Sequence, residues 1–135
     1  MEIARAWEET GVKIPAPYAR TIKMLFAPDK GDVSELSFSF ALIDPGGKTD
    51  FHAHDRPELI YIVSGRGLAV SEEGEVEVQG DMVLYARAGE KHQMVNTGAE
   101  TLKLATVFVP GYTAEFNYRR CLDAARAAGT DSDGA

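Results

Sequence analysis

The length, composition and charge of the chain are those of one globular domain and exclude several classes of protein. Its 135 residues suffice for a single hydrophobic core, and its 44% hydrophobic and 26% charged residues are ordinary for a soluble protein. A net charge of −7 argues against a nucleic-acid partner, and no apolar run approaches the ~20 residues that span a bilayer.

The first residues and the single cysteine bear on where the protein works. The opening segment, MEIARAWEET, has no apolar stretch, so we expect no secretory signal. Cys121 has no second cysteine to pair with, which fits a reducing compartment. We therefore expect a cytoplasmic protein with neither a membrane nor a nucleic-acid partner.

Short strands are predicted over most of the chain. Residues 1–20 are polar, contain Pro15 and Pro17, and are typical of an extended arm. Between residues 21 and 110, runs rich in β-branched and aromatic residues are separated by glycine and acidic turns. This pattern predicts an all-β fold, an antiparallel sandwich or barrel, with strands at 21–26, 36–43, 58–65, 67–71, 75–80, 82–86, 92–96 and 102–109.

The chain after Pro110 becomes alanine-rich and predicts a C-terminal helical extension over residues 111–129. The helix would begin near Thr113, with Glu115 in its first turn, and Gly129 would end it. Residues 130–135 are expected to form a disordered tail. The helix would either pack on the barrel or cap its mouth, and the sequence leaves both arrangements open.

Three histidines and one glutamate have the spacing of a metal site. His52 and His54 are two residues apart, so on an extended strand their imidazoles project from one face. Glu58 opens the next strand beside them, and His92 begins another strand after a turn. Imidazole nitrogens with one carboxylate form a transition-metal set that leaves coordination positions open. A single strand histidine is more often a surface residue, so the prediction depends on all four residues together.

The same residues resemble the two sequence motifs of the cupin family. In the first motif a glycine, a His-x-His pair, a glutamate and a second glycine follow at fixed spacing, which here are Gly46, His52, His54, Glu58 and Gly65. The second motif matches here, with Arg87 where proline is usual, at Gly80, Gly89, His92 and Asn96.

The resemblance implies a small antiparallel, jelly-roll-like cupin β-barrel over residues 21–110, and frequent homodimers. It implies one divalent transition metal ion (Fe, Mn, Ni, Zn or Cu) inside the barrel, held by His52, His54, Glu58 and His92. The family includes dioxygenases, isomerases, decarboxylases, lyases and non-catalytic binding proteins, so no single reaction follows.

Strand parity predicts which residues line the pocket. If Glu58 faces inward, alternate residues of its strand do so as well. Met94 would share the face of His92, whereas the apolar stripe at residues 38–42 is either barrel lining or an outer packing face. The candidate lining residues are Phe40, Ile60, Ile62, Tyr85 and Met94.

Other polar residues have structural explanations. Asn96 is expected to cap the turn at Thr97-Gly98, and Cys121 is expected to be buried and inert. Solvation explains the basic residues near turns, although two of them meeting at the mouth would bind a substrate carboxylate; these residues are Lys48, Arg56, Arg66, Arg87 and Lys91.

These observations favour a metalloenzyme that acts on a small organic molecule. Its reaction class, whether oxygenase, isomerase, decarboxylase or lyase, stays open. The alternative is a non-catalytic ligand-binding or sensing module in which the metal only anchors the ligand. A structural metal with a closed coordination shell is a third reading, which an open coordination position would exclude.

Overall fold

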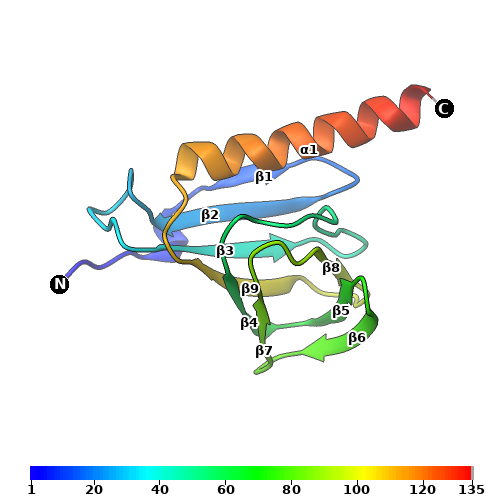
Figure 1. Ribbon diagram of the computed structural model, residues 1–135, viewed down its shortest axis with the longest axis horizontal. Coiled ribbons are helices and arrows are strands. Elements are labelled where there is room, and N and C mark those ends of the chain that lie inside the picture. The colour runs from blue at the N-terminus through cyan, green and yellow to red at the C-terminus, as the bar shows by residue number, and fades with distance from the viewer. Residues whose placement is uncertain (135) are drawn as a thin grey trace.

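In the computed structural model, which describes residues 1–134, the chain folds into two antiparallel sheets and a C-terminal helix (Figure 1). The larger sheet has six strands in the order β1-β2-β3-β9-β4-β7, and the smaller sheet has three in the order β6-β5-β8. This architecture confirms the predicted antiparallel β-barrel with a C-terminal helix. The bounds are η1 (Ala6–Glu8), β1 (Val12–Ile14), β2 (Arg20–Phe26), β3 (Ser37–Ile43), β4 (Glu58–Ser64), β5 (Arg66–Ser71), β6 (Gly74–Gln79), β7 (Val83–Ala86), β8 (His92–Asn96), β9 (Leu102–Phe108) and α1 (Ala114–Gly134).

The alternation of side chains in β3 and β4 decides which residues face the barrel interior. In β4, Glu58, Ile60 and Ile62 are buried while the residues between them are exposed, as parity predicts. In β3 the small residues Ser39 and Ala41 face inward, so the aromatic stripe of this strand lies on the outer face. The core between the sheets consists of Ala41, Ile43, Ile60, Ile62, Val78, Met94, Leu102 and Leu104.

All eight predicted strands are present as β2 to β9, but the sequence did not predict β1. This strand pairs with β2 in antiparallel register, so residues 1–20 are not only an extended arm. Three residues beside Pro15 are too short a run to show a period of two, and their pairing with β2 depends on the tertiary fold.

The helix α1 runs along β1 and β2 (Figure 1). Three of its residues, Asn117, Arg120 and Cys121, line the cavity of the barrel. A second apolar cluster joins it to the sheet, where Cys121 and Ala125 pack against Ile14, Ile22 and Met24. The phenol oxygen of Tyr118 accepts a hydrogen bond of 2.8 Å from the backbone N–H of Met24. Both arrangements that the sequence left open are therefore realised, because the helix packs on the sheet and its face also lines the barrel pocket.

The predicted end of α1 is wrong. The helix continues past Gly129 to Gly134, so it overlaps the disordered tail that was predicted for 130–135, and Ala135 lies outside the described residues.

Within residues 1–134, no helix combines the length and the apolarity that crossing a membrane requires.

Candidate metal centre

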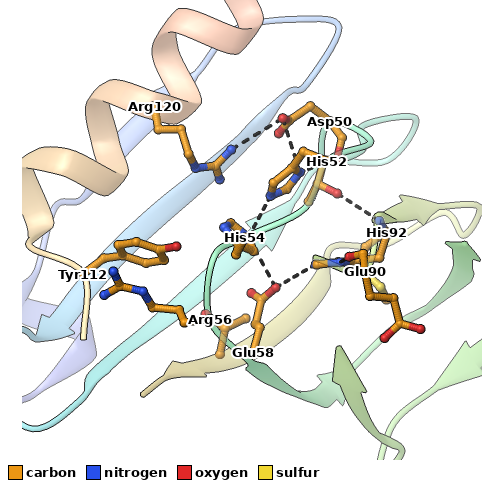
Figure 2. Close-up of polar contacts among 12 residues, drawn as sticks. Asp50, His52, His54, Arg56, Glu58, Glu90, His92, Tyr112 and Arg120 are labelled. Carbon is orange, nitrogen blue, oxygen red and sulfur yellow. Dashed lines mark hydrogen bonds and ion pairs between the residues drawn. The ribbon is translucent and has the colours of Figure 1, made fainter. Parts of the chain in front are cut away.

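The four predicted ligands lie together at one end of the barrel (Figure 2). Glu58 is the first residue of β4, and His92 is the first residue of β8. The other two, His52 and His54, lie in the connection between β3 and β4 rather than on a regular strand as predicted. The segment is nevertheless extended, because His52 and His92 form an isolated antiparallel bridge with two backbone hydrogen bonds of 3.2 and 3.0 Å.

The turn before β8 ties His54 to the strand that carries His92. Gly89, with a φ of +82°, donates its backbone N–H to the carbonyl oxygen of His54 at 2.8 Å, and glycine adopts this left-handed conformation without strain. Arg87 donates its backbone N–H to the carboxylate of Glu90 at 3.0 Å, a bond that the usual proline lacks the hydrogen to make. Hydrogen bonding therefore closes the turn in place of the proline ring.

The polar atoms of the four side chains converge on one point (Figure 2). One ligand atom from each of the three histidines lies within 4.8 Å of the others, and the Nε2 atoms of His52 and His54 are 2.7 Å apart. The Oε1 atom of Glu58 is 2.8 Å from Nε2 of His92 and 3.6 Å from Nε2 of His54. These distances bring together the donor atoms that the sequence predicted would share an ion.

Backbone carbonyls fix which nitrogen of the outer two imidazoles is free for a metal. The Nδ1 atom of His52 is 2.8 Å from the carbonyl oxygen of Asp50, and Nδ1 of His92 is 2.9 Å from that of Glu90. A carbonyl oxygen only accepts, so Nδ1 carries the proton and the neutral ring presents a bare lone pair on Nε2. Three imidazoles and a carboxylate whose donor atoms lie this close together fit a divalent transition metal ion, which would replace their contacts with one another.

Burial and neighbouring cations keep two of the imidazoles neutral, which is the form that ligates. Burial, and then the charge of Arg120, lower the pKa of His52. Burial, together with the charges of His52 and Arg120, lowers the pKa of His54 to about 2. For His92 burial acts downward, but the hydrogen bond and charge of Glu58 raise its pKa above the ordinary value. Positive charge is therefore stabilised on the Glu58 side of the site.

The predicted pocket-lining residues divide into three groups. Ile60 and Met94 line the cavity beside the histidines, as predicted. Ile62 is fully buried in the core and does not reach the cavity. For Phe40 the prediction is corrected, because Phe40 lies on the outer face of β3. Tyr85 is 54% exposed on β7 and lines a second pocket, which His92 and Met94 also border.

Sequence reasoning missed the polar residues that line the rest of the cavity. Arg20 of β2 is 2% exposed, and Asn117 and Arg120 of α1 lie over the same space, near Asp50. None of the basic residues that the sequence placed near turns lines this cavity. The signal for Arg20 was available, because it shares strand parity with the inward-facing Ile22 and Met24.

The signal in α1 was weaker. Asn117, Arg120 and Cys121 lie three and four residues apart, so they share one face of the helix. Only contact of α1 with the barrel turns that face toward the histidines, and no local pattern in the sequence contains this contact.

A model of the cupin domain family matches residues 39–109, which include all four candidate ligands. The chain belongs to the cupin family. Over 98 residues this cupin is 34% identical to the (R)-mandelonitrile lyase of Granulicella tundricola, a match that covers 68% of this chain and 72% of the relative. An uncharacterized protein of Methanocaldococcus jannaschii is 30% identical over 95 residues, covering 70% of this chain and 76% of that protein.

Solved structures show the same fold in proteins with different described activities. A predicted oxalate decarboxylase from Thermotoga maritima aligns with a TM-score of 0.72 and 22% identity, covering 80% of this cupin and 98% of that chain. Ectoine synthase from P. lautus aligns with a TM-score of 0.73 and 18% identity, covering 89% of this cupin and 86% of that chain. At these identities the likeness shows the fold, and the reaction has to be argued from the site.

Proposed function

We propose that this cupin is a metal-dependent enzyme that acts on a small organic molecule inside its barrel. One divalent transition metal ion would be held by His52, His54, Glu58 and His92. The observation that carries the proposal is the convergence of three imidazole ligand atoms within 4.8 Å, with Nδ1 of His52 and of His92 tied to backbone carbonyls. An ion in such a site polarises an oxygen of the substrate as a Lewis acid.

The chain itself supplies orientation and a water-poor wall. Ile60, Met94 and Leu104 line the cavity with apolar surface, and Phe108 packs edge-on against the His54 ring with centroids 4.7 Å apart. This packing holds His54 in one orientation. A low-dielectric wall also strengthens any electrostatic contact between bound substrate and the charged residues of the site.

The size of the cavity restricts the substrate. Its volume is about 50 Å³, well below the ~150 Å³ of an apolar cavity that holds benzene. The relative named for mandelonitrile acts on a molecule with a phenyl ring. We therefore propose a substrate smaller than that one, without an aromatic ring.

One observation favours the alternative, a non-catalytic ligand-binding or sensing cupin. Among the described residues that line the cavity, few are placed to move a proton. Glu58 is bonded to His92, the hydroxyls of Ser39 and Thr106 are bonded to each other at 2.7 Å, and burial raises the pKa of the Cys121 thiol. A module that only binds would need no such group.

The homodimer and the cytoplasmic location remain predictions, and we keep both as part of the proposal. An exposed apolar groove on the outer face of the six-stranded sheet supports self-association through that face. The groove is lined by Phe38, Phe40, Leu59, Tyr61, Val63, Ala105 and Val107.

Metal content of protein purified without added metal tests the ligand set. We expect about one transition-metal ion per wild-type chain by inductively coupled plasma mass spectrometry, and less than a tenth of that in Glu58→Ala and His92→Ala, because each removes a ligand. Glu90→Gln is the matched control, since its carboxylate bonds the Arg87 backbone and not the histidines. Full metal content in both alanine variants would contradict the proposal.

Turnover separates the enzyme from the sensor. Wild-type protein with its metal is incubated with a panel of small oxygen-bearing compounds, and their consumption is followed by proton NMR. Conversion that disappears in His92→Ala supports the enzyme. Saturable binding without any conversion across the panel would support the sensing alternative.

A further inference from the structure

We propose that the substrate is a small organic acid, whose carboxylate binds to Arg120 and Arg20 on the side of the cavity opposite Glu58 and His92. This inference rests on the proposed function, because it assumes that the metal ion holds the other end of the same molecule. It deepens that function by naming the substrate class.

Arg120 has donors directed at the cavity that no described residue fully uses (Figure 2). Its Nη1 atom is 3.4 Å from Oδ2 of Asp50, and its Nη2 atom is 3.3 Å from the Cys121 sulfur. A charge-assisted bond between a guanidinium and a carboxylate is shorter, about 2.7–2.9 Å. The Nε atom of Arg120 is buried and donates to nothing among residues 1–134. A planar acid is the ligand that best satisfies such a guanidinium.

Asn117 provides a second, independent observation at the same place. Its side chain is 5% exposed and lines the cavity, yet its Oδ1 atom has no hydrogen-bond partner in the described chain. Its Nδ2 atom reaches only the sulfur of Met24, at 3.5 Å, which is a weak acceptor. Buried amides in folded proteins are almost always bonded, so this side chain indicates a polar ligand.

The arginines do more than neutralise Asp50. Arg20 donates from Nη1 to the carbonyl oxygen of Tyr18 at 2.9 Å, and its Nη2 atom is 3.9 Å from Oδ1 of Asp50. That Oδ1 atom is itself buried and accepts no hydrogen bond from the described residues. If pairing with Asp50 were the whole role of the two arginines, both oxygens would lie within ordinary bonding distance.

Charge balance favours an anion when the metal is present. Without metal, the two positive charges of Arg20 and Arg120 cancel the two negative charges of Asp50 and Glu58. A divalent ion at the histidines leaves the site with two positive charges in a largely buried space. An uncompensated buried charge of this kind is costly, and a bound acid reduces it.

The cavity is suited to a small acid. Its volume of about 50 Å³ is roughly three to five times the ~10–15 Å³ that one water needs, which is the scale of an acid with two or three carbons. Arg20, Asn117 and Arg120 all lie outside residues 39–109, the part of the chain that matches the family model. The proposed acid-binding side is therefore formed by β2 and α1, outside the part of the chain that the family model matches.

Glycolate and glycolamide test this proposal, because they have nearly the same size and differ in charge. Binding of each to the metal-loaded protein is measured by isothermal titration calorimetry. We expect the wild type to bind glycolate at least tenfold more tightly than glycolamide. Arg120→Gln should weaken glycolate binding about 10- to 100-fold, since it removes charge-assisted hydrogen bonds, and leave glycolamide binding little changed.

Arg119→Gln is the matched control. Arg119 is the neighbouring residue, its side chain is 69% exposed, and it pairs with Glu115 on the outer face of α1. Removing its charge should leave glycolate affinity unchanged. If Arg120→Gln does not fold, Asn117→Leu tests the same surface and should weaken glycolate by at least threefold.

Equal binding of glycolate and glycolamide by the wild type would overturn the inference, as would full glycolate affinity in a folded Arg120→Gln. Metal content is measured on every sample, so a failure of the substrate class can be told from a failure of the proposed function. Loss of the acid preference with metal retained refutes the substrate class alone, whereas a wild type that retains no metal refutes the proposed function.

Discussion

Asn96 lies on the same face of β8 as His92, but its side chain is occupied by backbone groups. Its Nδ2 atom donates to the carbonyl oxygens of Ile43 at 2.9 Å and Glu100 at 2.8 Å, and its Oδ1 atom accepts from the N–H of Gly98 at 2.9 Å. This confirms the predicted cap on the turn and adds a tie to the end of β3. A residue of the second motif thus supports the fold near the candidate metal centre without contributing a ligand.

Replacing Asn96 separates this structural role from ligation. Asn96→Ala leaves two carbonyls and one N–H unpaired in a buried place, so we expect the free energy of unfolding to fall by about 3 kcal/mol. Metal content should stay at the wild-type level. Urea unfolding and elemental analysis of the same samples check both, and Asn96→Asp, which turns an acceptor oxygen toward the carbonyls of Ile43 and Glu100, should lose at least as much stability. An unfolding free energy that does not change in Asn96→Ala would be incompatible with this role.

The helix α1 is positioned by an acid from a distant loop. Its first four backbone N–H groups are all bonded: those of Ala114 and Glu115 donate to the Asp29 carboxylate, and the next two donate to the side chain and carbonyl of Thr113. Asp29 therefore fixes where α1 begins, and with it where Arg120 stands over the cavity. The sequence predicted the start near Thr113 but not this second cap.

Removing the cap should weaken the fold in a pH-dependent way. Asp29→Ala is expected to lower the free energy of unfolding by about 1 kcal/mol at neutral pH. Burial acts to raise the pKa of Asp29, but the N–H groups of Ala114 and Glu115 together hold it below its ordinary value. Because the folded pKa lies below the unfolded value of about 3.9, this stabilisation is complete above that pH and is lost as the pH falls through the folded pKa.

Chemical denaturation at neutral pH and near pH 3 measures the difference. The gap between wild type and Asp29→Ala should narrow at the lower pH. Asp123→Ala, an exposed acid later in the same helix, is the control and should change stability by less than about 0.5 kcal/mol at either pH. A gap that widened toward low pH would show that the carboxylate is not the stabilising group.

At the level of the whole molecule, local patterns predicted the barrel and the tertiary arrangement decided the rest of the site. Short runs of β-branched and aromatic residues between turn signals predicted β2 to β9, and the spacing of His52, His54 and Glu58 predicted their convergence with His92. The sequence left the aromatic stripe of β3 open between barrel lining and an outer packing face, and named Phe40 as a candidate lining residue. Ser39 and Thr106 line the cavity instead, with their hydroxyls bonded to each other. Phe38 and Phe40 of the stripe line the apolar groove on the outer face of the sheet.

The residues of α1 that line the cavity were beyond local prediction for a different reason. Arg120 reaches the cavity only because α1 folds back over β1 and β2. This docking depends on contacts between segments about a hundred residues apart, such as Tyr118 with Met24. A charged residue on an otherwise apolar helix face is a usable signal, but its partner cannot be read from the helix alone.

The central claim is that three imidazoles and one carboxylate share a single cation. X-ray absorption spectroscopy at the edge of the metal that co-purifies with the protein tests it most directly. The account predicts a first shell of nitrogen and oxygen at about 2.0–2.2 Å, with the outer-shell scattering of three imidazole rings. A first shell containing sulfur, or one without imidazole scattering, would contradict it.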